Sequence, residues 1–129
     1  MQHERPNCPL LPSAGRVGSQ GQGCFLTHCG WNSTAEAIAT GVPMIAIPQW
    51  ADEPTAAKYV ESTWGIGLRA RRGKKGLVRR EEVERCIKEV MRGKEYMRNA
   101  SKWMQKAKEA MQEGGSSDKN IADFAAKYL

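Results

Sequence analysis

The sequence predicts an α/β fold, in which a short parallel sheet is covered by helices. Three apolar segments alternate with two helical patterns between residues 24 and 70. The apolar segments are almost continuous, as in strands that are buried on both faces. Each of them is bounded by Gly, Pro or polar residues that favour turns. Strands and helices that alternate in this way are typical of a parallel sheet.

The elements follow one another in a regular order. Residues 24–28 (CFLTH) are predicted to form the first strand, and residues 33–40 (STAEAIAT) a helix that ends at Gly41. Residues 42–48 (VPMIAIP) form the second strand, which Pro48 ends. Residues 53–64 (EPTAAKYVESTW) form a second helix, with Pro54 in its tolerant first turn, and residues 65–70 (GIGLRA) form the third strand.

Three amphipathic helices are predicted after the third strand, near residues 81–91, 97–111 and 118–129. Their apolar faces are, in order, Val83, Ile87, Val90 and Met91; Met97, Ala100, Met104, Ala107 and Met111; and Ile121, Phe124, Ala125 and Tyr128. Residues 1–22 contain several Pro and Gly residues, and their apolar residues show neither helical nor strand periodicity. They are therefore predicted to be a disordered leader, separate from a domain over residues 23–129.

Composition limits the possible classes. The apolar runs are too short to span a bilayer, and the first residues do not resemble a signal peptide, so we expect a cytoplasmic protein without an integral membrane segment. The four cysteines, Cys8, Cys24, Cys29 and Cys86, show no CxxC spacing. Free buried thiols are therefore favoured over a disulfide or a zinc site near His28, and no metal is expected.

The net charge is +6, and much of the excess positive charge is concentrated in one segment, residues 69–80 (RARRGKKGLVRR). Such a segment could bind nucleic acid through phosphate contacts. It contains no aromatic residue on which a base could stack, so a solvated surface loop is the favoured interpretation. We expect no nucleic-acid partner.

The turn between the first strand and the first helix concentrates chemistry. His28 ends the strand, Gly30 allows a ligand to approach the backbone, and Asn32 and Ser33 add donors where a helix presents free N–H groups. Together they predict a cradle for a phosphate or diphosphate. A capping box of Ser33 and Glu36 is the structural alternative, but it does not account for the residues directly before it, His28, Gly30, Trp31 and Asn32.

The run GCFLTHCGWNSTAEAIATGVPMIAIPQWADEP resembles the second half of the signature of plant UDP-dependent glycosyltransferases of family 1, which have the GT-B fold. The resemblance continues through GGSSDKNIADF and covers about residues 23–129. It implies part of the Rossmann-like C-terminal domain of that fold, with a helical tail. The likeness is greatest to the branch that glucosylates phenols and carboxylic acids, including plant hormones.

The resemblance implies a UDP-sugar donor, no other cofactor and no metal. It implies inverting transfer of a sugar, glucose first of all, to a hydroxyl or carboxyl of a small lipophilic acceptor. Glu36 would bind the ribose, and Asp52 and Glu53 the sugar. The diphosphate would be held by the residues of the turn, namely His28, Gly30, Trp31, Asn32 and Ser33.

The sequence also departs from the family pattern. Glu53 stands where the family has Gln, Ser19 stands where it has His, and no Trp precedes Trp31. The family's catalytic base belongs to an N-terminal domain without a counterpart here, so we expect a fragment that is inactive alone. The alternative is a non-catalytic module that binds a nucleotide sugar or a partner. We also expect Glu53→Gln to improve the use of UDP-glucose in a full-length context.

Overall fold

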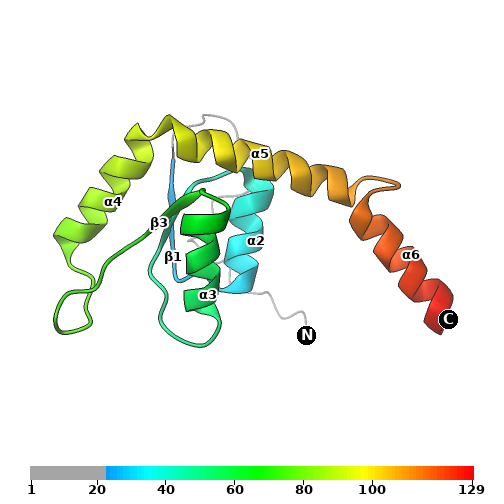
Figure 1. The fold of residues 1–129 in the computed structure, drawn as a ribbon, viewed down its shortest axis with the longest axis horizontal. Coiled ribbons are helices and arrows are strands. Elements are labelled where there is room, and N and C mark those ends of the chain that lie inside the picture. Colours follow the sequence, from blue (N-terminus) through cyan, green and yellow to red (C-terminus); the bar gives the residue numbers. More distant parts are fainter. Residues whose placement is uncertain (1–22) are drawn as a thin grey trace, which may run out of the picture.

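The computed structural model describes residues 23–129, and the predicted leader over residues 1–22 lies outside the described residues. A three-stranded parallel sheet of order β1-β2-β3 forms the centre of the domain (Figure 1). The central strand pairs with both neighbours in register, with Ile45 opposite Leu26 and Leu68. The predicted α/β class and parallel sheet are confirmed. The strands are β1 (Phe25–Thr27), β2 (Met44–Ala46) and β3 (Gly67–Arg69).

Helices cover both faces of this sheet, and the last two extend beyond it. The helices are α2 (Trp31–Thr40), α3 (Glu53–Lys58) with a π-helical continuation η1 (Tyr59–Thr63), α4 (Arg80–Arg92), α5 (Lys94–Met111) and α6 (Ser116–Tyr128). Figure 1 shows α5 crossing one end of α2 and α3, while α6 points away from the sheet. No described helix is long and apolar enough to cross a membrane.

The core lies on either side of β2. Met44 and Ala46 are fully buried in a cluster with residues of α2, α3, η1 and α5. Ile45, between them, is fully buried in a second cluster with Cys86 and Val90 of α4. Successive side chains of a strand point to opposite faces, so three apolar residues in a row serve both layers. This explains why the segment is apolar without a break.

The first helix ends as predicted but begins earlier. Gly41 closes it in the left-handed conformation, with φ 69°, in which glycine is not strained. The helix begins at Trp31 with Gly30 as its N-cap, and no side chain caps it. The structural alternative for Ser33 and Glu36, a capping box, does not form, because Ser33 already lies inside the first turn.

The apolar faces of the C-terminal helices are narrower than predicted. On α4 the buried residues are Cys86 and Val90, whereas Ile87 and Met91 are 40% and 46% exposed. The helix lies against strands of only three residues each, which cannot cover a wide stripe. On α5 only Ala100 is buried, and the stripe of α6 (Ile121, Phe124, Tyr128) is exposed.

Gly67 allows β3 to pair closely with β2. A Cβ atom at this position would lie 1.9 Å from the carbonyl oxygen of Met44 and 3.0 Å from Val60 Cγ1. The carbonyl belongs to the central strand and cannot move away without breaking the sheet. The position therefore requires glycine.

We predict that Gly67→Ala lowers the free energy of unfolding by at least about 3 kcal/mol, because the methyl group overlaps a strand backbone. Urea unfolding followed by circular dichroism measures it. Gly23→Ala is the matched control, since a Cβ there meets no atom within 4 Å. Equal stability of the two variants would contradict this account of the β2–β3 pairing.

Candidate donor-binding site

The turn after β1 is held in an unusual conformation. Cys29 is buried and adopts φ 65°, which residues other than glycine rarely do. Its backbone N–H donates to Thr27 Oγ1 at 3.1 Å, so the last residue of the strand fixes the turn. Strained backbone of this kind is concentrated at functional sites. The turn brings the chain directly from the carboxyl end of β1 to the start of α2.

The start of α2 presents free donors. At this end of the helix, the Thr34 N–H donates to the Gly30 carbonyl at 3.0 Å. Among the described residues, no side chain caps the helix and its first turn has no acidic residue. The N–H groups of Trp31, Asn32 and Ser33 are thus left for solvent or a ligand, and the helix dipole favours an anion there.

His28 lies beside this helix end. Its side chain is 56% exposed, so a ligand can reach the ring. A Cβ atom at Gly30 would lie 2.8 Å from His28 Nε2. Gly30 therefore gives the imidazole room to lie close to the backbone that leads into α2. The structure brings these two predicted site residues together.

A second loop, residues 47–52, follows β2 at the same edge of the sheet, because β1 and β2 are parallel. Ala51 in this loop has φ 56°, again a left-handed conformation. The carboxylate of Glu53 holds the loop: its Oε2 accepts the N–H of Gln49 at 2.7 Å and that of Trp50 at 3.1 Å. Glu53 is buried, and this capture of two backbone donors accounts for a carboxylate in that place.

The same carboxylate links the two loops. Glu53 Oε1 lies 3.7 Å from His28 Nε2, within the range of an ion pair when the imidazole is protonated. The Gln49 N–H, then the Trp50 N–H and the nearby His28, hold the pKa of Glu53 below its usual range, although burial acts in the opposite direction. Glu53 is therefore a charged connection between the β1 turn and the β2 loop.

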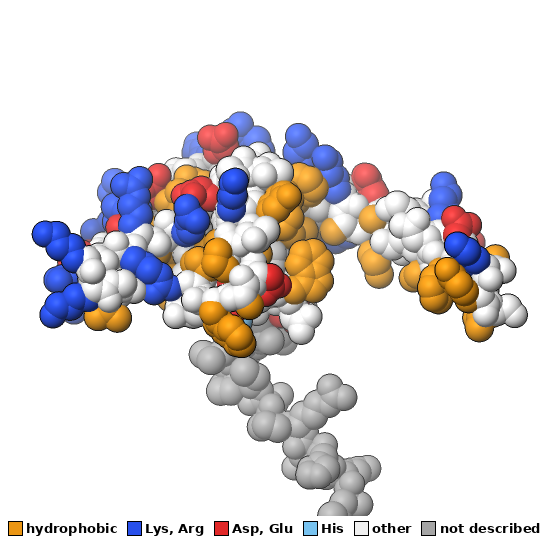
Figure 2. Space-filling model, turned by 60° about the horizontal axis from the view of Figure 1, so that its bottom comes forward, with side chains coloured by type: hydrophobic (Ala, Val, Ile, Leu, Met, Phe, Trp, Pro, Cys, Tyr) orange, Lys and Arg blue, Asp and Glu red, His pale blue; other side chains and the backbone are white. Residues whose placement is uncertain are grey.

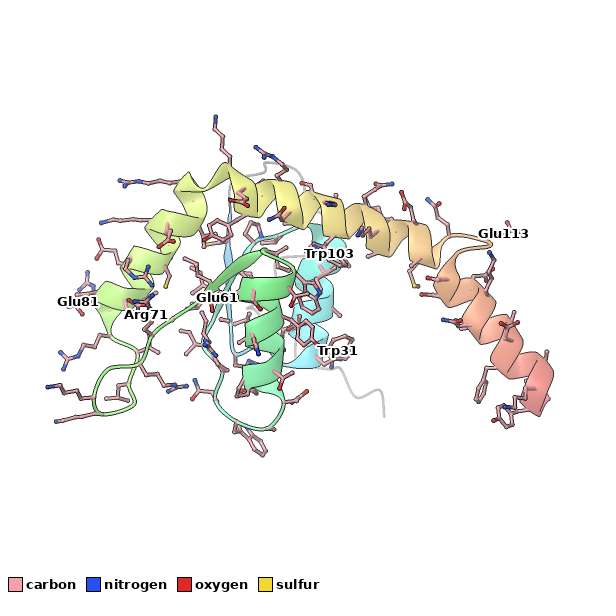
Figure 3. All side chains as sticks on the ribbon, in the orientation of Figure 1. Trp31, Glu61, Arg71, Glu81, Trp103 and Glu113 are labelled. Atoms are coloured by element: carbon pink, nitrogen blue, oxygen red, sulfur yellow. The ribbon has the colours of Figure 1, made fainter. Side chains whose placement is uncertain are left out.

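The other predicted site residues lie around this connection. Asp52 is exposed as the N-cap of α3, and its side chain caps no N–H of the helix. Glu36 is exposed on α2, one turn after the free N–H groups. Trp31 is 65% exposed at the start of α2 and points outward (Figure 3). The ligand-binding roles of these residues stay predictions. The effect of Glu53→Gln on the use of UDP-glucose is also still a prediction.

The thiols near the site, Cys24 and Cys29, are expected to be unreactive. Burial raises the pKa of Cys29 to about 11, and it also raises that of Cys24. Both thiols therefore stay protonated near neutral pH, which disfavours metal ligation and nucleophilic attack. Among residues 23–129, no group of three or more His, Cys, Asp or Glu side chains is placed to hold a metal ion.

Three contributors to the site were not predicted from the sequence. Thr27 fixes the β1 turn through its hydroxyl. The Trp50 side chain is 74% exposed on the β2 loop, and the backbone N–H of Trp50 donates to the Glu53 carboxylate. Arg72 donates from its guanidinium to the carbonyl of Pro48, which ties the segment after β3 to the β2 loop. Of the three, only Trp50 could have been noticed in the sequence, because a large aromatic residue two positions after Pro48 is unexpected in a turn.

A protein-family comparison matches residues 9–109 to the family described as "UDP-glucoronosyl and UDP-glucosyl transferase". Among curated proteins, "UDP-glucosyltransferase UGT13248" of Hordeum vulgare subsp. vulgare is 68% identical over 124 residues. That alignment covers 94% of this chain and 26% of the barley protein. The chain thus spans about a quarter of the length of this relative.

Solved structures agree with the sequence comparison. The crystal structure of Os79 from O. sativa "in complex with U2F and trichothecene" matches with a TM-score of 0.85 and 60% identity, over 94% of this chain and 28% of that chain. The structure of Phytolacca americana UGT2 "complexed with UDP-2fluoro-glucose and pterostilbene" matches with a TM-score of 0.76 and 37% identity, over 81% and 24%. The described fold therefore matches a part of the fold of these two proteins.

We predict that the hydrogen bonds from the Gln49 and Trp50 N–H groups to the Glu53 carboxylate depend on pH. The pKa of Glu53 is lower in the folded protein than the ordinary glutamate value of about 4.5. The stabilising effect of the carboxylate is therefore complete above pH 4.5, and it is lost as the pH falls through the lower pKa of the folded state. The amide proton shifts of Gln49 and Trp50, followed by NMR, should titrate with a midpoint below 4.5, and Glu53→Gln should abolish this titration.

Glu113→Gln is the control, because Glu113 is an exposed glutamate far from the loop. It should leave both amide titrations unchanged. If the Gln49 and Trp50 amides titrate alike in the unmodified chain and in Glu53→Gln, the carboxylate does not hold the loop in solution.

Proposed function

Because the chain belongs to the UDP-glucuronosyl and UDP-glucosyl transferase family, we propose that residues 23–129 bind the UDP-sugar donor of a plant-type glycosyltransferase. The free N-terminus of α2 beside the exposed His28 is the observation that carries the proposal. It offers backbone donors, a helix dipole and an imidazole at one place, which suits a diphosphate. The whole protein would act in the cytoplasm.

In this proposal, different residues at the two loops bind different parts of the UDP-sugar donor. The N–H groups of Trp31, Asn32 and Ser33 bind the diphosphate, together with His28. Glu36, one turn along α2, accepts hydrogen bonds from the ribose hydroxyls. Asp52 binds hydroxyls of the sugar, because its exposed carboxylate is not used to cap α3. Glu53 holds the β2 loop and can present its Oε1 to the same sugar.

The proposed reaction is direct displacement with inversion at the anomeric carbon. An acceptor oxygen forms a bond to that carbon as the bond to the UDP oxygen breaks, and the bonding electrons leave with UDP. Negative charge then grows on the diphosphate. The His28 side chain, as a hydrogen-bond donor, and the N-terminus of α2 stabilise it, so the proposed mechanism does not need a metal ion for this purpose.

The acceptor is proposed to be a small lipophilic molecule with a hydroxyl or carboxyl group. Two related enzymes support this class, since Os79 was crystallised with a trichothecene and the Phytolacca enzyme with pterostilbene. We assign no catalytic base among residues 23–129. In the proposal the base and the acceptor pocket belong to the part of the enzyme that this chain does not match.

A second candidate is a module that binds a nucleotide sugar without transferring it. The observation that favours it is that the proposed donor groups, His28 and the N-terminus of α2, lie within residues 23–129, where we assign no catalytic base. The two candidates share the donor site and differ in turnover. Incubation of a full-length protein that contains residues 23–129 with UDP-glucose and a panel of phenols and carboxylic acids distinguishes them, because only a transferase forms a glucoside.

We predict that the 129-residue chain binds UDP-glucose but forms no glucoside with any member of that panel, as measured by mass spectrometry. The donor groups are present, whereas no base is assigned. Formation of a glucoside that depends on the chain would contradict the division of the enzyme proposed above. Absence of any binding of UDP-glucose would contradict the donor site itself.

We also predict that His28→Ala weakens the binding of UDP-glucose by about 1.5–3 kcal/mol, the range for a hydrogen bond to a charged group. This corresponds to a roughly 10- to 150-fold higher Kd in isothermal titration calorimetry. Gln105→Ala, a change on the exposed surface of α5, is the control. An unchanged Kd for His28→Ala would leave His28 a structural residue only.

A further inference from the structure

The positive charge of the chain is concentrated in residues 69–80, which we call the basic hairpin. It contains seven Lys and Arg residues and no acidic residue. The whole chain has 20 Lys and Arg against 14 Asp and Glu, so the remainder has 13 against 14. The excess charge of +6 is therefore a property of this segment alone. Its cations are Arg69, Arg71, Arg72, Lys74, Lys75, Arg79 and Arg80.

These cations are not neutralised within the described part of the chain. Only Arg69 approaches a carboxylate, that of Glu61, at 4.0 Å. Three of the four acidic residues of the adjoining helix α4 pair with its own cations: Arg85 with Glu82 and Glu89, and Lys88 with Glu84, each at 2.7 Å. The fourth, Glu81, lies near the hairpin but forms no ion pair within 4.0 Å with a described residue. Most of the nearby carboxylates are thus bound to other cations, and the basic hairpin keeps most of its charge exposed.

The backbone of the basic hairpin is held in place. The Gly73 N–H donates to the Leu77 carbonyl at 2.8 Å, and the Gly76 N–H donates to the Gly73 carbonyl at 2.9 Å. The Arg72 guanidinium donates to the Gly76 carbonyl at 2.7 Å, and the Arg71 N–H to Glu82 Oε1 at 2.9 Å. The turn is therefore a formed feature. Figure 1 shows it projecting from the end of the molecule opposite α6.

An apolar side chain lies within this charged turn. Leu77 is 65% exposed, directly after Lys74, Lys75 and Gly76. An open hollow of about 290 Å³ lies between the basic hairpin and the start of α4, lined by Arg71, Arg72, Gly73, Arg79, Glu81 and Glu82. Figure 2 shows Lys and Arg side chains gathered at this end of the molecule, and Figure 3 places Arg71 and Glu81 there. Cations around an exposed leucine form an amphipathic surface.

We propose that the basic hairpin docks on a membrane surface that contains acidic phospholipids. The Lys and Arg side chains contact the phosphate-bearing headgroups, and Leu77 enters the boundary between headgroups and acyl chains. The charge complementarity and the exposed leucine favour this partner over nucleic acid. A nucleic-acid backbone gives Leu77 no apolar environment, and residues 69–80 offer no aromatic side chain for a base.

Co-sedimentation of the 129-residue chain with vesicles tests this proposal. Vesicles of phosphatidylcholine with phosphatidylserine should bind the chain at least about tenfold more tightly than phosphatidylcholine alone, and added salt should weaken the binding. Each cation near such a surface contributes about 1 kcal/mol, so Lys74→Ala/Lys75→Ala should reduce the partition coefficient roughly 30-fold. Leu77→Ser should reduce it roughly tenfold, because the leucine no longer enters the interface.

Lys102→Ala/Lys108→Ala is the matched control, since it removes the same charge from the exposed surface of α5. It should change the partition coefficient less than about twofold. Circular dichroism should show all variants folded, because the substituted side chains are exposed. The proposal is overturned by the absence of vesicle binding, by equal loss in the control, or by insensitivity to Leu77→Ser. Tighter binding of RNA, duplex DNA or poly-glutamate than of the acidic vesicles would also overturn it.

Discussion

The short strand β2 is the constraint on which the domain depends, because its three residues are buried on both sides. Met44 and Ala46 anchor the layer of α2, α3 and α5, and Ile45 anchors α4. Parallel pairing on both edges then places the ends of β1, β2 and β3 at one edge of the sheet. Every loop that carries candidate chemistry starts at that edge. The core thus determines where a ligand can bind.

At that edge, local backbone strain and one buried carboxylate shape the proposed donor site. Cys29 and Ala51 both take left-handed conformations, one in each loop. Thr27 fixes the first loop, and Glu53 fixes the second while approaching His28. The departure from the family pattern at residue 53 therefore has a structural account: a carboxylate can accept two backbone N–H groups and face an imidazole. The exposed His28, Asp52 and N–H groups are left for a ligand.

The sequence was informative where a local pattern decides the structure. The three strands, the end of α2 at Gly41 and the place of His28 at the end of a strand follow from apolar runs and turn residues. The start of α2 was predicted two residues late, because Ser33 and Glu36 form a capping pattern whereas Gly30 is the cap. The roles of Glu53 and Arg72 depend on contacts between separate loops, which no local pattern reveals. The exposure of Ile87 and Met91 likewise depends on how little of α4 the short strands cover.

The proposed membrane docking and the donor site involve different parts of the same edge. Arg72 joins them, because it belongs to the basic hairpin and donates to the Pro48 carbonyl of the β2 loop. Docking would hold a transferase close to acceptors dissolved in the membrane. The central claim concerns the donor site, and an NMR titration of the 129-residue chain with UDP tests it most directly. The account predicts that the largest amide shifts occur at Trp31, Asn32 and Ser33. Shifts confined to residues 73–79, or none at all, would contradict it.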